Sequence, residues 1–215
     1  MTIYLHQRVS LFAIIFDGKT KKAFYISGMH AIKKIVVIGP ESTGKSTLCE
    51  QLAQHYKTIW CPEYAREYLL QHGTHYSYED LLSIAKGQLS LEDSALTEIE
   101  RSVDRNTATN PLLFIDTEMY VMKVWCEVAF EQCHTWILKQ IAQRNYDMHL
   151  LCDVDLPWTK DELREYPDLV YRKKLFKIYK DILVNSGSKW SVISGTDSER
   201  LQTAVSILNT VFEKK

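Results

Sequence analysis

Long apolar runs are missing from this sequence. The stretch LFAIIF at 11–16 is followed at once by DGKTKK, whereas a membrane helix needs ~20 apolar residues. The N-terminus also lacks the small-residue cleavage site of a secretory signal. The five cysteines are odd in number and include no C-x-x-C pair, which favours reduced thiols over a disulfide framework. We therefore expect a cytoplasmic protein with no membrane partner.

An excess of positive charge is also missing. The chain carries 26 Lys and Arg against 27 Asp and Glu, a formal charge of −1, so it has no broad basic face for nucleic acid. Its 215 residues are enough for one substantial core and too few for two ordinary domains. Composition therefore predicts one globular unit and no nucleic-acid partner.

Apolar strands and amphipathic helices alternate from residue 33 onward. Strands are predicted at 34–38, 57–61, 111–118, 147–154 and 189–195, and helices at 45–56, 62–73, 78–103, 119–143 and 197–213. Strands that are apolar throughout and separated by helices indicate a parallel sheet covered on both faces. We therefore predict a three-layer α/β/α domain over 31–215 with a mainly parallel five-stranded sheet. Residues 1–30 are either a β-hairpin around Asp17-Gly18 or a loosely attached extension.

The turn after the first strand matches the P-loop pattern. It reads GPESTGKS over 39–46, which fits G-x-x-x-x-G-K-[ST] between a strand and a helix. Glycines let the backbone wrap around a phosphate, the lysine reaches the β- and γ-phosphates, and the hydroxyl holds Mg²⁺. We predict a P-loop NTPase fold that binds ATP with Mg²⁺ as cofactor, through Gly39, Glu41, Ser42, Thr43, Gly44, Lys45, Ser46 and Thr47. Pro40 removes one N–H from this cradle.

An acid ends the third strand. Asp116 closes the run LLFID, and P-loop proteins place such an acid beside Mg²⁺. The predicted metal ligands are therefore Ser46 and Asp116. The alternative is that Asp116 only caps the helix that follows it.

Among P-loop proteins the pattern favours a small-molecule kinase. No N-K-x-D motif for reading guanine is present, and the chain is short for an AAA+ ATPase with a helical lid domain. Glu63, after the second strand, can accept a proton from an acceptor hydroxyl, and Arg66 can neutralise the transferring phosphate. In the alternative interpretation, Glu63 complements a helix start and Arg66 pairs with a neighbouring acid.

Two later stretches complete the predicted site. The polar segment 155–176 can close over the phosphates and exclude water, with Arg164 and Arg172 as its candidate cations; a solvated helix face is the alternative. The turn SGTD at 194–197 can lie against an adenine ring, which makes Thr196 a candidate nucleotide contact. It is equally compatible with an ordinary helix N-cap at Thr196 or Asp197.

These pieces together resemble the ribosylnicotinamide kinase domain of NadR-type proteins, in the order GPESTGKSTL, PEYARE, IDTE and DLPWTKDELR across about 33–213. The resemblance implies ATP-dependent phosphorylation of the 5′-hydroxyl of nicotinamide riboside, giving nicotinamide mononucleotide for NAD salvage. It also implies a lid position for Arg164, an acceptor-side position for Glu63, Tyr64, Arg66 and Gln88, and a place near the metal and the 5′-hydroxyl for Asp116. Either Asp116 or Glu63 is the base, and Tyr64 or Trp125 can stack on the pyridinium ring.

The sequence departs from that family in three places. DTE replaces the more usual DTD, which puts the role of Glu118 in doubt, and Glu162 stands where relatives commonly carry Gly. The first thirty residues are too few for an adenylyltransferase domain, and no H-x-G-H motif is present, so we do not expect adenylyl transfer. The alternatives are a kinase for another nucleoside or small alcohol, or a nucleotide-dependent regulatory ATPase.

Overall fold

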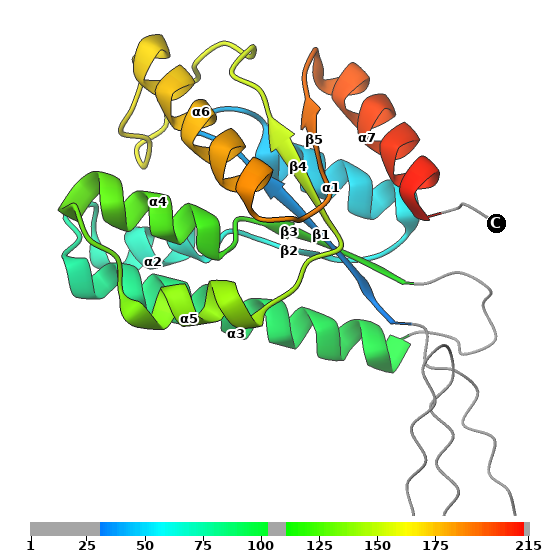
Figure 1. Cartoon of the computed structure of the whole chain (residues 1–215), viewed down its shortest axis with the longest axis horizontal. Coiled ribbons are helices and arrows are strands. Elements are labelled where there is room, and N and C mark those ends of the chain that lie inside the picture. The colour runs from blue at the N-terminus through cyan, green and yellow to red at the C-terminus, as the bar shows by residue number, and fades with distance from the viewer. Residues whose placement is uncertain (1–30, 103–110, 213–215) are drawn as a thin grey trace, which may run out of the picture.

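Five parallel strands form the central sheet of the computed structural model, which describes residues 31–102 and 111–212 (Figure 1). The predicted hairpin within 1–30 lies outside the described residues. The strands are β1 (Lys33–Ile38), β2 (Trp60–Cys61), β3 (Leu112–Asp116), β4 (Met148–Cys152) and β5 (Trp190–Ile193), in the order β2-β3-β1-β4-β5. The prediction of a parallel five-stranded sheet is confirmed. β2 is shorter than the predicted strand over 57–61.

β1 is central because both of its faces are apolar. Ile35, Val36, Val37 and Ile38 are all fully buried. Alternate side chains of a strand point to opposite faces, so Ile35 and Val37 enter one core cluster and Val36 and Ile38 enter another. β1 therefore pairs on both sides, with β3 and with β4.

Helices cover both faces of the sheet and complete the three layers (Figure 1). One face packs against α1 (Lys45–Tyr56) and α7 (Asp197–Phe212). The other packs against α3 (Tyr78–Ser102), α4 (Met119–Phe130) and α6 (Leu169–Asn185). The remaining helices are α2 (Tyr64–His72), packed on α3, and α5 (Thr135–Gln143), packed on α4. The predicted three-layer fold is confirmed.

Helix α6 differs from the sequence interpretation of 155–176 as one hinged segment. The last eight residues of that segment, 169–176, instead belong to the first half of the 17-residue helix α6. The Asp168 carboxylate caps this helix by accepting from the Tyr171 amide at 2.6 Å. Such a side-chain cap satisfies an otherwise unpaired first-turn N–H. Only residues 153–168 therefore remain as a loop after β4.

The strand order creates a crevice at the carboxyl ends of β1 and β3. The chain leaves β1 into α1 on one face of the sheet and leaves β3 into α4 on the other. Ligands of open α/β sheets bind where connections diverge in this way. The P-loop and Asp116 both follow these strand ends, so the topology brings them together.

The cysteines and the helices add two observations. All five cysteines are free thiols, and Cys49, Cys61, Cys126 and Cys152 are buried. None of the helices within 31–102 and 111–212 combines the length and apolar character that a membrane crossing requires.

Candidate functional site

The loop between β1 and α1 requires glycine at both of its ends. Gly39 has φ +148°, and a Cβ there would lie 2.8 Å from the carbonyl oxygen of Cys152. Gly44 has φ +76°, in the left-handed region, and a Cβ would lie 3.1 Å from Leu156. An L side chain is strained at such φ values and lacks space here. Ser42 adopts φ 55° between them, so the loop turns back over the start of α1.

The side chains of Thr43 and Lys45 both bind the carbonyl group of Pro40. The Thr43 hydroxyl donates to the carbonyl oxygen of Pro40 at 2.7 Å, and the Lys45 ammonium donates to the same oxygen at 3.2 Å. The lysine side chain thus folds back over the loop to which it belongs. A P-loop lysine in this position can reach the terminal phosphates of a nucleotide.

Ser46 and Asp116 lie together at the carboxyl ends of the central strands. The Ser46 hydroxyl donates to Asp116 Oδ2 at 2.5 Å. Burial, followed by the nearby charge of Glu63, raises the pKa of Asp116 to about 6, against the lowering effects of Lys45 and Ser46. Asp116 Oδ1 is buried and accepts no hydrogen bond from the described residues. A carboxylate with a spare oxygen beside a hydroxyl fits Mg²⁺, which binds through one or two protein oxygens plus phosphates and waters.

Glu63 faces the same carboxyl end from β2. Glu63 is the N-cap residue of α2, and its Oε1 accepts a hydrogen bond from the Thr117 hydroxyl at 3.3 Å. Thr117 itself has φ 75°, an uncommon conformation for a β-branched residue. Glu63 and Asp116, the two candidate bases, therefore flank one turn.

Arg66 and Gln88 make contacts that the sequence did not indicate. Arg66 Nη1 donates to both carboxylate oxygens of Asp161, at 3.0 and 3.2 Å, and so ties α2 to the loop after β4. Gln88 is buried, and its amide donates to the carbonyl oxygens of Pro62 and Asp116 while its oxygen accepts from the Tyr64 amide. These bonds hold the Gln88 side chain against the backbone beside Asp116, and the acceptor-side position that the family resemblance implied stays a prediction.

The loop after β4 closes over the P-loop. The Glu41 carboxylate accepts from the amides of Glu165 and Tyr166 at 3.0 and 3.1 Å. The Ser42 hydroxyl accepts from the Thr159 amide at 3.0 Å and from Arg164 at 3.3 Å. Burial raises the pKa of Glu41, and the hydrogen bonds from the Tyr166 and Glu165 amides oppose that rise. The variable positions of the P-loop therefore hold residues 159–166 above the cradle.

A cavity of about 340 Å³ lies between these groups. It is lined by the whole P-loop through Thr47 and by charged side chains of Glu63, Arg66, Asp116, Arg164 and Glu165. Its remaining wall is apolar and aromatic and includes Trp60, Leu69, Val121, Trp125, Tyr166, Leu175 and Tyr179. The phosphate cradle, both candidate bases and an aromatic pocket thus share one cavity.

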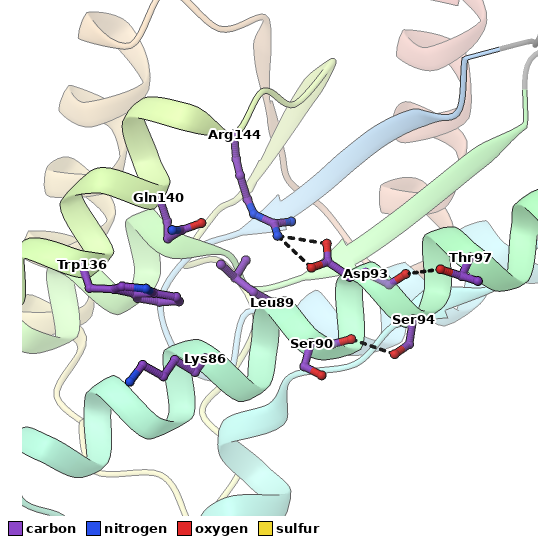
Figure 2. A pocket seen from close by; sticks show the side chains of 9 residues that line it. All are labelled: Lys86, Leu89, Ser90, Asp93, Ser94, Thr97, Trp136, Gln140 and Arg144. Carbon is purple, nitrogen blue, oxygen red and sulfur yellow. Dashed lines mark hydrogen bonds and ion pairs between the residues drawn. The ribbon is translucent and has the colours of Figure 1, made fainter.

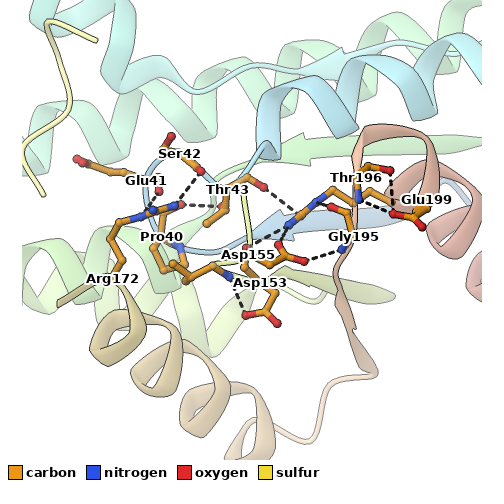
Figure 3. Close-up of polar contacts among 12 residues, drawn as sticks. Pro40, Glu41, Ser42, Thr43, Asp153, Asp155, Arg172, Gly195, Thr196 and Glu199 are labelled. Atoms are coloured by element: carbon orange, nitrogen blue, oxygen red, sulfur yellow. Dashed lines mark hydrogen bonds and ion pairs between the residues drawn. The ribbon is translucent and has the colours of Figure 1, made fainter. Parts of the chain in front are cut away.

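Two buried arginines contact the P-loop, and neither of them lines this cavity; Figure 3 shows Arg172 reaching the loop. Arg172 in α6 donates to the carbonyl oxygens of Glu41 and Ser42, and Arg200 in α7 donates to that of Thr43. Arg172 was expected to close over phosphate, but its guanidinium binds loop carbonyls instead. Arg200 was missed by the sequence analysis, because nothing local distinguishes an arginine in a polar helix start.

Two other candidates have local structural roles. The Thr196 amide and hydroxyl both donate to the Glu199 carboxylate, at 2.7 and 2.8 Å, which is a capping interaction at the start of α7. The N-cap alternative for Thr196 is therefore the one seen. Glu118 is buried and caps α4 by accepting from the Tyr120 amide at 2.8 Å. Burial raises the pKa of Glu118 to about 8.

A second hollow, of about 460 Å³, lies between α3 and α5 and contains no P-loop residue (Figure 2). Arg144 spans it by donating to both carboxylate oxygens of Asp93, and it also pairs with Glu92 at 3.1 Å. Lys86 and Trp136 line the other end. Arg144 and Asp93 are paired with each other, and Lys86 lies over the Trp136 ring at 5.9 Å, so this hollow lacks the phosphate loop and the convergent carboxylates of the P-loop cavity.

Comparison with known proteins gives the same picture. The NadR proteins of Escherichia coli K12 and Salmonella typhimurium LT2, trifunctional NAD biosynthesis/regulator proteins, are 28% and 26% identical over 156 and 170 residues. The matches cover 71% and 77% of this chain, which spans only 36% and 39% of those relatives.

Solved structures share the fold. A NadR protein in complex with NR matches with a TM-score of 0.65 at 22% identity, over 86% of this chain and 52% of that one. A thymidylate kinase from Ehrlichia chaffeensis matches with a TM-score of 0.57 at 12% identity, over 82% and 98%. The family model described as an AAA domain matches residues 34–200. With the P-loop and Asp116 in place within that span, the chain belongs to the AAA domain family.

Proposed function

We propose that this protein is an ATP-dependent kinase that phosphorylates the 5′-hydroxyl of nicotinamide riboside, giving nicotinamide mononucleotide. One observation carries the proposal: the P-loop, both candidate bases and several aromatic side chains line the same cavity. The choice of acceptor rests on the NadR relatives, since NadR protein has been solved in complex with NR and in complex with NAD and AMP-PNP.

The donor side follows from the P-loop. The amides of the loop and the Lys45 ammonium bind the β- and γ-phosphates, and the positive end of the α1 dipole adds to this attraction. Ser46 and Asp116 hold Mg²⁺, which when bound neutralises charge on the phosphates. Arg164, which lies beside Ser42, supplies a further cation over the transferring group.

The acceptor side needs a base within reach of the 5′-hydroxyl. Asp116 and Glu63 are the two candidates; a pKa of about 6 leaves Asp116 mainly ionised at neutral pH and still basic enough to accept a proton. If Asp116 binds the metal, Glu63 takes the proton. Trp125 and Tyr166 offer aromatic faces, and Glu165 a carboxylate, to a cationic pyridinium ring.

The decisive experiment offers the purified protein ATP, Mg²⁺ and a panel of nucleosides and small alcohols. ADP release that depends on nicotinamide riboside, with a phosphorylated product, supports the proposal. Release with a different acceptor would assign another small-molecule kinase. Slow release that is indifferent to every acceptor would favour a regulatory ATPase.

A matched pair of lysine variants checks the site. Lys45→Ala removes the ammonium from the cradle and is expected to abolish turnover while the protein stays folded. Lys86→Ala removes an exposed lysine from the hollow on α3 and is expected to leave turnover unchanged. Full activity in the Lys45 variant would refute the site assignment.

A further inference from the structure

Three successive carbonyl groups of the P-loop are bound by buried guanidinium groups (Figure 3). Arg172 Nε donates to the carbonyl oxygen of Glu41 at 3.1 Å, and Arg172 Nη2 donates to that of Ser42 at 2.9 Å. Arg200 Nη1 donates to the carbonyl oxygen of Thr43 at 3.1 Å. The two arginines come from different helices, α6 and α7, and reach the loop across 131 and 157 residues of sequence.

These carbonyls determine where the loop amides point. In a trans peptide the C=O and the N–H of one plane point in opposite directions, and no peptide bond in the described residues is cis. The carbonyls of Glu41, Ser42 and Thr43 share their planes with the amides of Ser42, Thr43 and Gly44. Within 31–102 and 111–212, no acceptor receives a hydrogen bond from those three amides. A guanidinium that fixes the direction of a carbonyl oxygen therefore also fixes the opposite direction of the amide in the same plane, and backbone amides held in this way can bind phosphate.

Both arginines are fixed in place. Arg172 and Arg200 are each only 2% exposed. Arg200 also donates to the carbonyl oxygens of Gly195 and Asp153, at 2.9 and 3.2 Å, and pairs with the Asp155 carboxylate. A guanidinium can bind two acceptors in a fixed fork, whereas a lysine ammonium presents a single point charge. Neither side chain is free to swing toward a nucleotide.

We infer that Arg172 and Arg200 are positioning residues, which orient the P-loop amides toward phosphate by holding the carbonyls of residues 41–43. The inference rests on the nucleotide binding in the proposed function and deepens it. It replaces the direct phosphate contact predicted for Arg172. The guanidinium charge beside each carbonyl oxygen also polarises that peptide group and makes its N–H a stronger donor.

The test measures nucleotide binding without any acceptor. Arg172→Lys and Arg200→Lys keep the charge but lose the fork, and Arg144→Lys is the matched control, since it alters a paired arginine at the end of α5 that does not line the P-loop cavity. Calorimetry with Mg²⁺ and a non-hydrolysable ATP analogue is run well below each variant's unfolding temperature. We expect binding about tenfold weaker or worse in the first two variants, the size of one lost charged hydrogen bond. The control should bind as wild type does.

A spectroscopic measurement separates orientation from general destabilisation. In ¹H–¹⁵N spectra the analogue should shift the amides of Ser42, Thr43 and Gly44 strongly in wild type and in Arg144→Lys, and less in the two other variants. Unchanged affinity and unchanged shifts in folded Arg172→Lys and Arg200→Lys would overturn the inference.

Two cases need their own interpretation: a variant that does not fold, and a wild-type protein that binds no analogue. If Arg200→Lys does not fold, Asp155→Asn weakens the same arginine's anchoring from the surface side, and it should reduce affinity about twofold or more; wild-type affinity in that variant would count against the inference. If wild-type protein binds no analogue, the proposed function fails. If wild type binds and the variants match it, only the role of the arginines fails.

Discussion

Gly87 in α3 lies against the Tyr64 ring of α2, so the effect of Gly87→Ala on the free energy of unfolding should change sign when that ring is removed. Gly87 lies in α3, and a Cβ built there would be 2.0 and 2.2 Å from two carbon atoms of the Tyr64 ring. Alanine in a helix interior is normally favoured over glycine by about 1 kcal/mol. Here the ring must move by more than an ångström, and overpacking of this kind costs about 1–3 kcal/mol. We expect Gly87→Ala to destabilise wild type by about 1 kcal/mol.

Removing the ring should reverse that sign. In a Tyr64→Ala background the steric conflict is gone, so Gly87→Ala should stabilise by up to about 1 kcal/mol. The coupling free energy in this double-mutant cycle is then about 2 kcal/mol. Ser94→Ala, an exposed change further along the same helix whose hydroxyl donates to the Ser90 carbonyl oxygen, serves as the control that should show no coupling to Tyr64.

Urea unfolding of the four cycle members provides the measurement. The reasoning is refuted if Gly87→Ala changes the free energy of unfolding by the same amount in both backgrounds. The site supplies a second readout. Tyr64 follows Glu63 directly, so displacing its ring should raise the KM for the acceptor more than the KM for ATP.

Three further predictions concern charge. Burial lowers the pKa of His149 to about 4, below the ~6.5 of an unfolded histidine. Unfolding therefore takes up a proton between these values, and wild-type stability should fall by up to about 3 kcal/mol from pH 6.5 to 4. His149→Gln should lack that loss in acid titrations of stability. Asp116→Asn should cost at least about a hundredfold in kcat and weaken the response to Mg²⁺; wild-type turnover would exclude both of its proposed roles. Arg66 is 54% exposed in its pair with Asp161, which is 20% exposed, so Arg66→Ala should change the free energy of unfolding by less than about 1 kcal/mol while lowering kcat. A normal kcat would leave the pair with Asp161 as the only role of Arg66.

The parts of the fold that sequence predicted are those with a local signal. The fully apolar run at 34–38 indicated a central strand because a strand buried on both faces needs no alternation. The glycines at 39 and 44 identified the phosphate loop, because few other residues adopt their backbone angles. Asp116 followed from its place after an apolar run. The strand order β2-β3-β1-β4-β5 was not predicted, since no local pattern encodes which strands become neighbours.

The parts that sequence missed depend on contacts between distant residues. Arg172 was assigned to a closing segment because its neighbours are polar, and only the packing of α6 shows that it is buried against the loop. Gln88 was placed by family resemblance, yet its amide is used by three backbone groups. Residues 169–176 were interpreted as part of a hinged segment because the stretch 155–176 is polar and carries Arg164, Arg172, Lys173 and Lys174. The predicted contacts of the other site residues with ligands stay predictions.

The thiol of Cys152 offers an internal reporter for the strand end beside the phosphate loop. Its Cβ lies 3.3 Å from the position that a Cβ on Gly39 would take, and burial raises its pKa to about 12. Only about one molecule in ten thousand carries the thiolate at pH 8 while the thiol stays covered. Alkylation of Cys152 therefore requires the strand end to open, and the alkylation rate reports how often that local opening occurs. A nucleotide that binds the loop and the start of α1 should slow the alkylation of Cys152. Mass spectrometry can therefore follow how nucleotide binding stabilises this strand end.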